Sequence, residues 1–527
     1  MPNYTTSLWS EAVPPTTYPP LSANLTVDVA VVGAGITGVT AARLLQSAGR
    51  KVAILEARRV GKGETGKTTA HLTEALDTRY HLLISRFGTD GARLAAEGQR
   101  LAIDQIATYA RDLQIACDFR RVPGYLYADD RSQLSDLEEE ARAVEKLGLA
   151  ATLTNDVPLP FPVLRGLRFE NQATFHPRLY LNGLVEAFTR DGGLLFEETQ
   201  VVGIEESGGV CRVNTDHGVV TARDVIVAAH VPISNRFLLH TKLAAYRTYA
   251  VAFEQPALGE DAMFWDMADP YHYTRSQKVG DRSYVIVGGD DHKVGEDEDT
   301  AVPFIHLENY VRAKFGCEVA PTDYRWSGQI IVPVDGLPLI GKNSASTHVY
   351  VASGYSGNGM TNGTLGAMVI ADQIALGRSR FTELLDPTRI KPLASAKLFV
   401  AENADFPKHL LQDRMPHPGP EALAAIPPGD GQVLSFKGQR LAVYRNANGE
   451  LSALSPVCTH LGCLVHWNTA EKSWDCPCHG SRFDPHGRVL NGPAVTALEA
   501  RPIPDVPETA EEPRAPAIPG EGHPTTP

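Results

Sequence analysis

The sequence lacks the features that would place the protein in a membrane or on a nucleic acid. No stretch approaches the ~20 consecutive apolar residues that a membrane-spanning helix needs. Positive charge is in deficit, because 49 lysines and arginines face 62 aspartates and glutamates, for a formal net charge of −13. This balance disfavours binding to nucleic acid or to an anionic membrane surface. We therefore expect no nucleic acid among the partners and no membrane span.

The sequence also lacks a secretory signal peptide, and it contains few cysteines. Residues 1–25 contain neither a basic start nor an apolar run, so we expect an N-terminal extension rather than a signal peptide. The chain has seven cysteines in 527 residues, and three of them (Cys117, Cys211 and Cys317) are isolated along the sequence. Such usage is typical of a reducing compartment. We therefore predict a cytoplasmic protein.

The other four cysteines are concentrated in two short boxes near the C-terminus. The boxes read Cys458-Thr-His460-Leu-Gly-Cys463 and Cys476-Pro-Cys478-His479-Gly-Ser481. Two thiolates and two imidazoles from paired loops suit a Rieske-type 2Fe–2S cluster, in which two histidines replace two cysteines on one iron. Zinc also takes cysteine and histidine ligands and is the alternative, although it would leave two of the six candidates idle. The boxes therefore favour one-electron transfer.

These boxes resemble those of Rieske proteins, and the resemblance covers about residues 428–505. It implies that the cluster is held by Cys458, His460, Cys476 and His479. It also implies a disulfide between Cys463 and Cys478, as in the cytochrome-complex branch of the family. The segment 491–494 is similar to the loop that covers the cluster in that family.

One position departs from the Rieske pattern. Ser481 matches a serine that donates a hydrogen bond to a cluster sulfur, but Phe483 stands where high-potential members carry a tyrosine. Hydrogen bonds to the sulfurs raise the reduction potential of such a cluster. The missing donor therefore implies a lower potential.

Near the N-terminus, the sequence predicts a strand, a glycine-rich turn, a helix and a second strand. Apolar runs at 26–32 and 51–55 flank a glycine-rich turn and a helical pattern, and the second run ends on an acid. This order matches the dinucleotide-binding fingerprint, in which glycines bring the backbone to the pyrophosphate and the acid binds a ribose. The alternative is that these glycines serve turns alone. The predicted dinucleotide contacts are Gly33, Gly35, Thr37, Gly38 and Glu56.

About residues 26–385 resemble the superfamily of D-amino-acid oxidase and glycine/sarcosine oxidase. The resemblance rests on the fingerprint, the strand at 224–229 and a late glycine-rich turn at 354–361. It implies non-covalent FAD, with the late turn bringing a helix N-terminus to the flavin, where backbone N–H groups stabilise negative charge. The further FAD contacts that it implies are Arg58, Lys67, Thr68, Thr69, Val201, Gly357, Gly359 and Met360.

A second nucleotide motif competes for part of this region. Residues 61–68 satisfy the P-loop pattern G-x-x-x-x-G-K-T letter by letter, which would indicate an ATPase or GTPase. The motif follows Glu56 directly, and no apolar strand ending in a magnesium-binding aspartate follows at a suitable distance. We therefore interpret the segment as part of the FAD site.

Together these patterns predict an α/β Rossmann-like FAD-binding domain, a mixed-sheet α+β substrate domain and a C-terminal all-β Rieske domain. The FAD-binding parts are expected at about 26–80, 171–240 and 326–385, and the substrate domain at about 81–170 and 241–325. A linker is expected at 386–427, the Rieske domain at 428–505 and a disordered tail at 506–527.

The family resemblance implies oxidation of a C–N bond, with a hydride leaving the carbon beside an amine nitrogen. The candidate catalytic residues are Tyr273 and Arg275, and Arg275 could clamp a substrate carboxylate. Asp290 or Asp291 could instead select a cationic polyamine. Each of these residues could equally serve packing alone.

An FAD-dependent oxidoreductase fused to a Rieske domain predicts a dehydrogenase for a small amine or amino acid. Its electrons would pass from FAD singly through the cluster to an external carrier, such as a quinone, a cytochrome or a redox protein. In one alternative, electrons flow in reverse, and the cluster reduces flavin for a reductive or monooxygenase reaction. In another alternative, the chain is a non-catalytic redox sensor.

Overall fold

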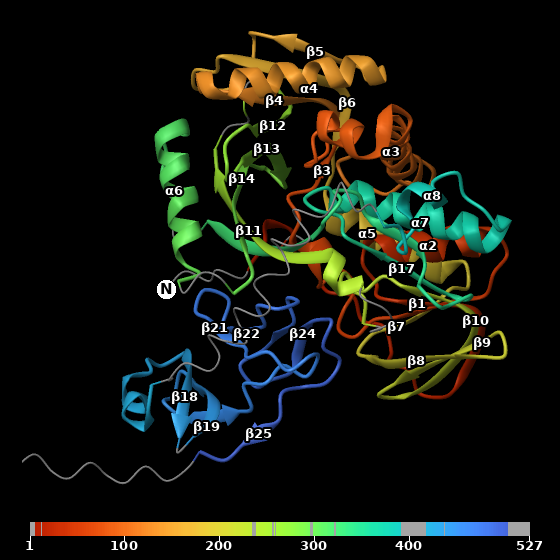
Figure 1. The fold of residues 1–527 in the computed structure, drawn as a ribbon, viewed down its shortest axis with the longest axis vertical. Helices are drawn as coiled ribbons and strands as arrows, with labels where there is room; N and C mark the ends of the chain where they lie inside the picture. Colours follow the sequence, from red (N-terminus) through yellow and green to blue (C-terminus); the bar gives the residue numbers. More distant parts are fainter. Residues whose placement is uncertain are drawn as a thin grey trace, which may run out of the picture.

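The structure is a computed structural model in which the chain forms two large sheets and a smaller C-terminal β region (Figure 1). The residues that it describes are 6–11, 13–233, 239–255, 258, 260–295, 299–320, 323–390, 418–436 and 438–503. The expected linker lies largely outside these residues, and the expected tail lies wholly outside them. The domain boundaries expected from the sequence stay predictions.

The first sheet has eight strands and a parallel centre. Its main path runs β16-β17-β10-β1-β2-β7, in which β16 alone is antiparallel to its neighbour, and β8 and β9 extend from β10. Parallel strands are covered on both faces, which explains the continuous apolar runs in their sequences. The strands are β1 (Leu25–Val32), β2 (Val52–Leu55), β7 (Leu194–Phe196), β8 (Val201–Ser207), β9 (Val210–Thr215), β10 (Gly218–Val227), β16 (Leu339–Lys342) and β17 (Val349–Ser353).

Helices pack against this sheet and against one another. The helix α2 follows the glycine-rich turn and contacts α5 and α7, while α7 also contacts α3, β16 and β17. Residues of α2 and α7 that face the sheet are buried in one continuous apolar core. The helices are α2 (Ile36–Ser47), α3 (Tyr80–Asp112), α5 (Pro177–Arg190), α7 (Gly359–Leu376) and α8 (Thr382–Leu385).

The second sheet has nine strands and is mixed, as predicted. Its main path runs β15-β11-β14-β13-β12-β4-β6-β3, and only β12 and β4 pair in parallel. Helix α6 (Val302–Phe315) packs on β11 and β14, and α4 (Leu134–Leu147) packs near β4, β5 and β6. The strands are β3 (His71–Leu72), β4 (Arg120–Ala128), β5 (Ala151–Thr154), β6 (Arg165–Thr174), β11 (Leu243–Glu254), β12 (Met263–Asp266), β13 (His272–Val279), β14 (Arg282–Lys293) and β15 (Tyr324–Pro333).

The C-terminal region is all-β, as predicted, and consists of two four-stranded antiparallel sheets. Figure 1 shows strands β21, β22 and β24 on the side of β11, with β18, β19 and β25 farther out. One sheet contains β18 (Asp430–Phe436), β19 (Gln439–Arg445), β20 (Leu451–Leu454) and β25 (Ala500–Arg501). The other contains β21 (His466–Asn468), β22 (Ser473–Asp475), β23 (Arg482–Phe483) and β24 (Val489–Asn491).

The N-terminal extension packs onto the body of the protein. Its short helix α1 (Leu8–Glu11) buries Trp9, whose indole N–H donates to the carbonyl of Thr68 at 2.6 Å. The Ser7 hydroxyl donates to the carbonyl of Gly66 at 2.8 Å. The extension therefore supports the loop that contains the P-loop-like motif.

Within the described ranges, no helix combines the length and the apolar character that crossing a bilayer requires.

Candidate functional site

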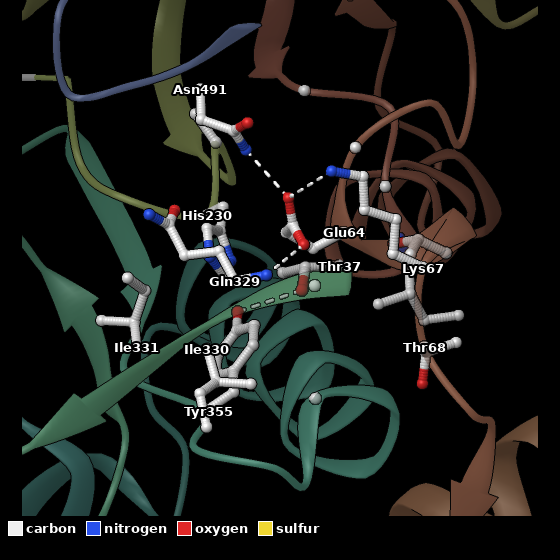
Figure 2. Close-up of a pocket in the computed structure, with 18 of the residues that line it drawn as sticks. Thr37, Glu64, Lys67, Thr68, His230, Gln329, Ile330, Ile331, Tyr355 and Asn491 are labelled. Carbon is white, nitrogen blue, oxygen red and sulfur yellow. Dashed lines mark hydrogen bonds and ion pairs between the residues drawn. The ribbon is translucent and has the colours of Figure 1, made fainter. Parts of the chain in front are cut away.

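A cavity of about 310 Å³ lies between the first and second sheets and is also bordered by the C-terminal region. From the first sheet and its helices, the wall includes Gly33, Gly35, Thr37, Glu56 and Met360. From the second sheet, it includes His71, Thr248, Trp265, Tyr273, Asp291 and Gln329. Figure 2 shows part of this wall, in which the hydroxyl groups of Thr37 and Tyr355 share a hydrogen bond of 3.0 Å.

The glycine-rich turn has the close packing that the dinucleotide fingerprint requires. Gly33 has a φ of 104°, and a Cβ there would lie 2.6 Å from the carbonyl oxygen of Ala228. A Cβ on Gly38 would lie 2.0 Å from the carbonyl oxygen of Gly33. Gly38 does not line the cavity, so its role is to let α2 approach the turn.

Glu56 lies at the end of β2 in the cavity wall, where the fingerprint places its acid. Its carboxylate accepts hydrogen bonds from the backbone N–H of Ala34 at 2.8 Å and of Arg58 at 2.9 Å. Burial raises the pKa of Glu56, although both hydrogen bonds act to lower it. The position and chemistry of this carboxylate fit a dinucleotide ribose.

The other predicted FAD contacts come together around the same cavity. Residues 357–360 form the turn and the first residues of α7, and the Asn358 side chain does not cap that helix. The N-terminus of α7 therefore faces the cavity, as expected for a group that stabilises negative charge. The predicted contacts that line the cavity are Arg58, Lys67, Thr68, Thr69, Val201, Gly357, Gly359 and Met360.

The P-loop-like segment does not have the P-loop structure. It contains a short 3₁₀ helix, η1 (Glu64–Gly66), and leads into β3 instead of a long helix. Thr65 accepts a hydrogen bond from the Ile36 N–H at 3.1 Å, so the segment packs against the start of α2. Its lysine, Lys67, forms an ion pair with Glu64 at 3.7 Å. The segment thus serves the dinucleotide cavity.

Glu64 is a residue that the sequence patterns did not single out. Its Oε1 atom accepts from the Asn491 side-chain amide at 2.9 Å, and its Oε2 atom accepts from the Gln329 backbone N–H at 2.6 Å (Figure 2). Burial would raise the pKa of Glu64, but Lys67, His230 and Arg247 outweigh it and lower the pKa to about 2. Glu64 is therefore a buried anion that connects all three sheet regions.

The two candidate catalytic residues differ in their placement. Tyr273 lines the cavity, and its hydroxyl shares a hydrogen bond of 2.7 Å with the Thr248 hydroxyl. Arg275 does not line the cavity, and its guanidinium donates to the carbonyl of Ala70 at 2.6 Å and to the Gln277 side chain. A role for Arg275 as a carboxylate clamp does not fit this position, because its donors are used to hold the backbone.

The two Cys/His boxes meet in the C-terminal region. Cys476 donates a hydrogen bond to Cys458, and this bond lowers the pKa of the Cys458 thiol to about 7. The rings of His460 and His479 lie 5.0 Å apart between centroids. Cys463 and Cys478 form a disulfide, as the Rieske resemblance implied. Two neighbouring thiols and two neighbouring imidazoles fit the ligand set of a Rieske cluster.

The disulfide also bears on the zinc alternative. The sulfur atoms of Cys463, Cys476 and Cys478 lie within 4.8 Å of one another, which is a spacing that could hold a metal ion. Two of these sulfurs are bonded to each other and cannot act as thiolates. The three-cysteine group therefore offers a single thiol.

Two contacts from the larger part of the chain reach the Cys/His boxes. His240, in the 3₁₀ helix η3 (Leu239–Lys242), packs its ring 4.8 Å from that of His460 and 5.6 Å from that of His479. The Gln329 side-chain amide donates to the carbonyl of Gly480, next to His479, at 2.8 Å. Neither contact was predictable from local sequence patterns, because the partners lie more than 100 residues apart.

The C-terminal region also completes the wall of the cavity. Residues that follow β23 face the same space as the glycine-rich turn, and they are Val489, Leu490, Asn491, Gly492, Ala494 and Val495. The Gln200 side-chain amide fixes this loop by donating to the carbonyl of Val495 at 2.8 Å. The predicted cluster-covering loop is therefore also part of the predicted FAD site.

A buried ion network joins the two parts of the chain. Glu471, between β21 and β22, accepts hydrogen bonds from Arg247 on β11 and from Arg482 on β23. The exposed side-chain fractions are 1% for Arg247, 2% for Arg482 and 6% for Glu471. Arg482 also pairs with Asp475 at 2.9 Å. Such a network holds its partners in one geometry, because separating them would leave charges buried without partners.

Comparison with protein families agrees with this arrangement. The family described as FAD dependent oxidoreductase matches residues 28–373, and the Rieske [2Fe-2S] domain matches residues 422–505. A protein of Bacillus subtilis (strain 168), the Rieske 2Fe-2S iron-sulfur protein YhfW, is 31% identical over 93% of this chain and 96% of its own length.

Two further relatives cover only the larger part of the chain. Gamma-glutamylputrescine oxidoreductase of Escherichia coli (strain K12) is 27% identical over 68% of this chain and 85% of its own length. The crystal structure of L-proline dehydrogenase from P. horikoshii has a TM-score of 0.59 and 19% identity, and the match covers 71% of this chain and 98% of that one. The likeness to the dehydrogenase shows a shared fold.

The matched family and the residues around the cavity agree on the cofactors. The FAD dependent oxidoreductase family uses FAD and the Rieske domain uses a 2Fe–2S cluster, and the residues of the cavity and of the Cys/His boxes fit these two groups. The chain is an enzyme that belongs to the FAD dependent oxidoreductase family and carries a C-terminal Rieske [2Fe-2S] domain.

Proposed function

We propose that the protein is a dehydrogenase that oxidises the C–N bond of a small amine or amino acid at the FAD site and delivers the electrons singly, through the Rieske cluster, to an external carrier. FAD supplies an acceptor for two electrons, which arrive as one hydride. A Rieske cluster supplies one-electron transfer. The similarity to gamma-glutamylputrescine oxidoreductase supports the substrate class. An oxidase that passes electrons directly to oxygen would have no need of the cluster.

The observation that carries this proposal is the wall shared by the two cofactor sites. Gln329 lines the cavity, and its side chain donates to Gly480, which adjoins the predicted ligand His479. The loop that carries Asn491 and Ala494 lies in the same wall. A short covalent and hydrogen-bonded path therefore connects the cavity with the cluster site.

The external partner is proposed to be a quinone, a cytochrome or a small redox protein. His240 covers the rings of both predicted histidine ligands, and this position favours a carrier that reaches the cluster from another side. The scarcity of cysteine supports a cytoplasmic location.

An anaerobic screen of amines and amino acids with an artificial electron acceptor tests the proposal. Visible spectra and electron paramagnetic resonance should show flavin bleaching followed by cluster reduction with at least one substrate. Flavin reduction only by a reduced cluster would favour reverse electron flow. Turnover that is unchanged by Cys476→Ser with every acceptor would contradict the electron route and favour a sensor.

A further inference from the structure

Residues of the second sheet line one end of the cavity. One of them is an aspartate with a carboxylate oxygen that has no hydrogen-bond partner among the described residues. Thr248 on β11, Trp265 on β12, Tyr273 on β13 and Asp291 on β14 all line this end. Asp291 accepts a hydrogen bond from Thr248, but its Oδ1 atom is buried and has no hydrogen-bond partner among the residues that the structure describes. A buried carboxylate oxygen without a donor is costly, so its position in a cavity indicates a ligand that donates.

This end of the cavity contains no side chain suited to a substrate carboxylate. Among the described residues of the wall, the only lysine and arginine are Lys67 and Arg58, both on the loop after β2. Lys67 pairs with Glu64, and Arg58 adjoins the ribose acid Glu56. Burial lowers the pKa of His71 to about 3, so this histidine is neutral. The nearby Arg275 donates to backbone carbonyls outside the cavity.

The remaining surface of this end is aromatic. The ring of Tyr273 lies 5.7 Å from those of Tyr271 and His71, and the ring of Trp265 lies 5.5 Å from that of His71. Aromatic faces attract ammonium groups, and they do so most strongly where water is excluded. Aromatic rings beside an unpaired carboxylate form a site for an organic cation.

We infer that Asp291 binds the substrate's ammonium group, and that the substrate is an amine without an α-carboxylate. This inference rests on the proposed function and narrows its substrate class. In the site, Asp291 first pairs with the ammonium ion and then accepts one of its protons. The nitrogen then carries a lone pair that can stabilise loss of a hydride from the neighbouring carbon, and FAD, when bound in the cavity, would supply the two-electron acceptor for that hydride. The resulting iminium product is hydrolysed by water to a carbonyl compound and an amine.

The first experiment compares substrates that differ only in the carboxylate. Anaerobic holoenzyme is mixed with L-proline or pyrrolidine, and with L-ornithine or putrescine, and flavin bleaching is followed by absorbance. Each amine should reduce the flavin at least 10-fold faster than the corresponding amino acid, because a carboxylate would enter a site without a cationic partner. Faster reduction by the amino acids would overturn the inference while leaving the proposed function intact. Bleaching by none of the compounds would overturn both.

The second experiment tests Asp291 with a matched neighbour as the control. Asp291→Asn removes the charge with little change in shape, and it should raise the amine concentration for half-maximal flavin reduction about 10- to 100-fold. Asp290→Asn is the control, because Asp290 lies outside the cavity wall and pairs with the exposed His306 at 3.0 Å. It should behave like the wild type.

A binding measurement separates ammonium recognition from turnover. Tetramethylammonium has no proton to lose and cannot become a neutral amine, so it should perturb the flavin spectrum without reducing it. We expect this perturbation in the wild type, in Asp290→Asn and, more weakly, in Asp291→Glu, but not in Asp291→Asn. An unchanged titration in Asp291→Asn would overturn the inference. A loss of FAD from both Asp291 variants would also overturn it, because the carboxylate would then be a cofactor contact.

Discussion

At the scale of single residues, a small number of side chains belong to both cofactor sites. Gln329 is one of them, because its backbone N–H donates to Glu64 in the dinucleotide cavity and its side chain donates to Gly480 beside the cluster site. Asn491 is another, because it comes from the cluster-covering loop and donates to the same Glu64. Through these hydrogen bonds, the two residues connect the cavity with the Cys/His boxes.

Asp291 should also give the reaction a pH dependence. The pKa of Asp291 is raised to about 7, chiefly by burial and also by the charges of Asp77 and Asp290, while the hydrogen bond from Thr248 acts to lower it. The neighbouring Tyr271, Tyr273 and His71 are neutral at this pH, because burial raises the pKa of both tyrosines and lowers that of the histidine. Only the carboxylate form can accept the ammonium proton, so flavin reduction should slow as the pH falls through about 7.

Stopped-flow reduction of the flavin at several pH values checks this expectation. The step near pH 7 should be absent in Asp291→Asn and retained, at a slightly lower pH, in Asp290→Asn, because the Asp290 charge raises the pKa of Asp291. A step that persists unchanged in Asp291→Asn would assign the ionisation to another group.

At the scale of secondary-structure elements, strands β11 and β15 both contribute to the junction between the two parts of the chain. Thr248, next to Arg247 on β11, faces the cavity, while Arg247 itself enters the buried network with Glu471. Ser327, on the neighbouring β15, accepts a hydrogen bond from Arg247 and donates one to Glu471. One pair of strands therefore positions both the substrate end of the cavity and the Rieske domain.

Replacing Glu471 should weaken this junction. Glu471→Gln leaves the buried Arg247 and Arg482 without their shared anion, and breaking a buried pair in this way costs about 3–5 kcal/mol. Burial would raise the pKa of Glu471, but Arg247, Arg482 and Lys67 lower it well below its usual value. The stabilisation is thus complete above the usual glutamate range and is lost only as the pH falls through that lowered pKa.

The urea concentration at which the cluster absorbance is lost measures this effect. It should fall in Glu471→Gln and stay unchanged in Glu318→Gln, which removes an exposed ion pair with Arg312. Equal midpoints for the two variants would show that the network does not hold the domain.

Elements and motifs were predictable from the sequence, whereas contacts between them were not. The fingerprint, the late turn and the Cys/His boxes each depend on local spacing, so their structures follow from residues such as Gly33 and Gly38. Arg275 shows the limit, because its sequence neighbourhood cannot reveal that its guanidinium turns toward the Ala70 carbonyl. Glu64 and Gln329 were missed for the same reason, since their partners come from segments distant in sequence.

At the scale of the whole molecule, the Rieske domain is fixed against the cavity. The junction combines the Arg247–Glu471–Arg482 network, the Gln329–Gly480 hydrogen bond and the cavity wall formed by residues 489–495. A domain held at so many points has no need to move between donor and acceptor. Electron transfer between the two cofactors should therefore occur within one molecule and in one arrangement.

The most direct test is the rate at which the cluster is reduced after the flavin, measured by rapid mixing of anaerobic holoenzyme with a reducing amine. We expect a first-order rate that does not change with protein concentration. Gln329→Leu should slow this step, while Glu318→Gln, which removes only the exposed ion pair with Arg312, should leave it near the wild-type rate. A rate proportional to protein concentration, or a cluster that stays oxidised beside reduced flavin, would contradict the account.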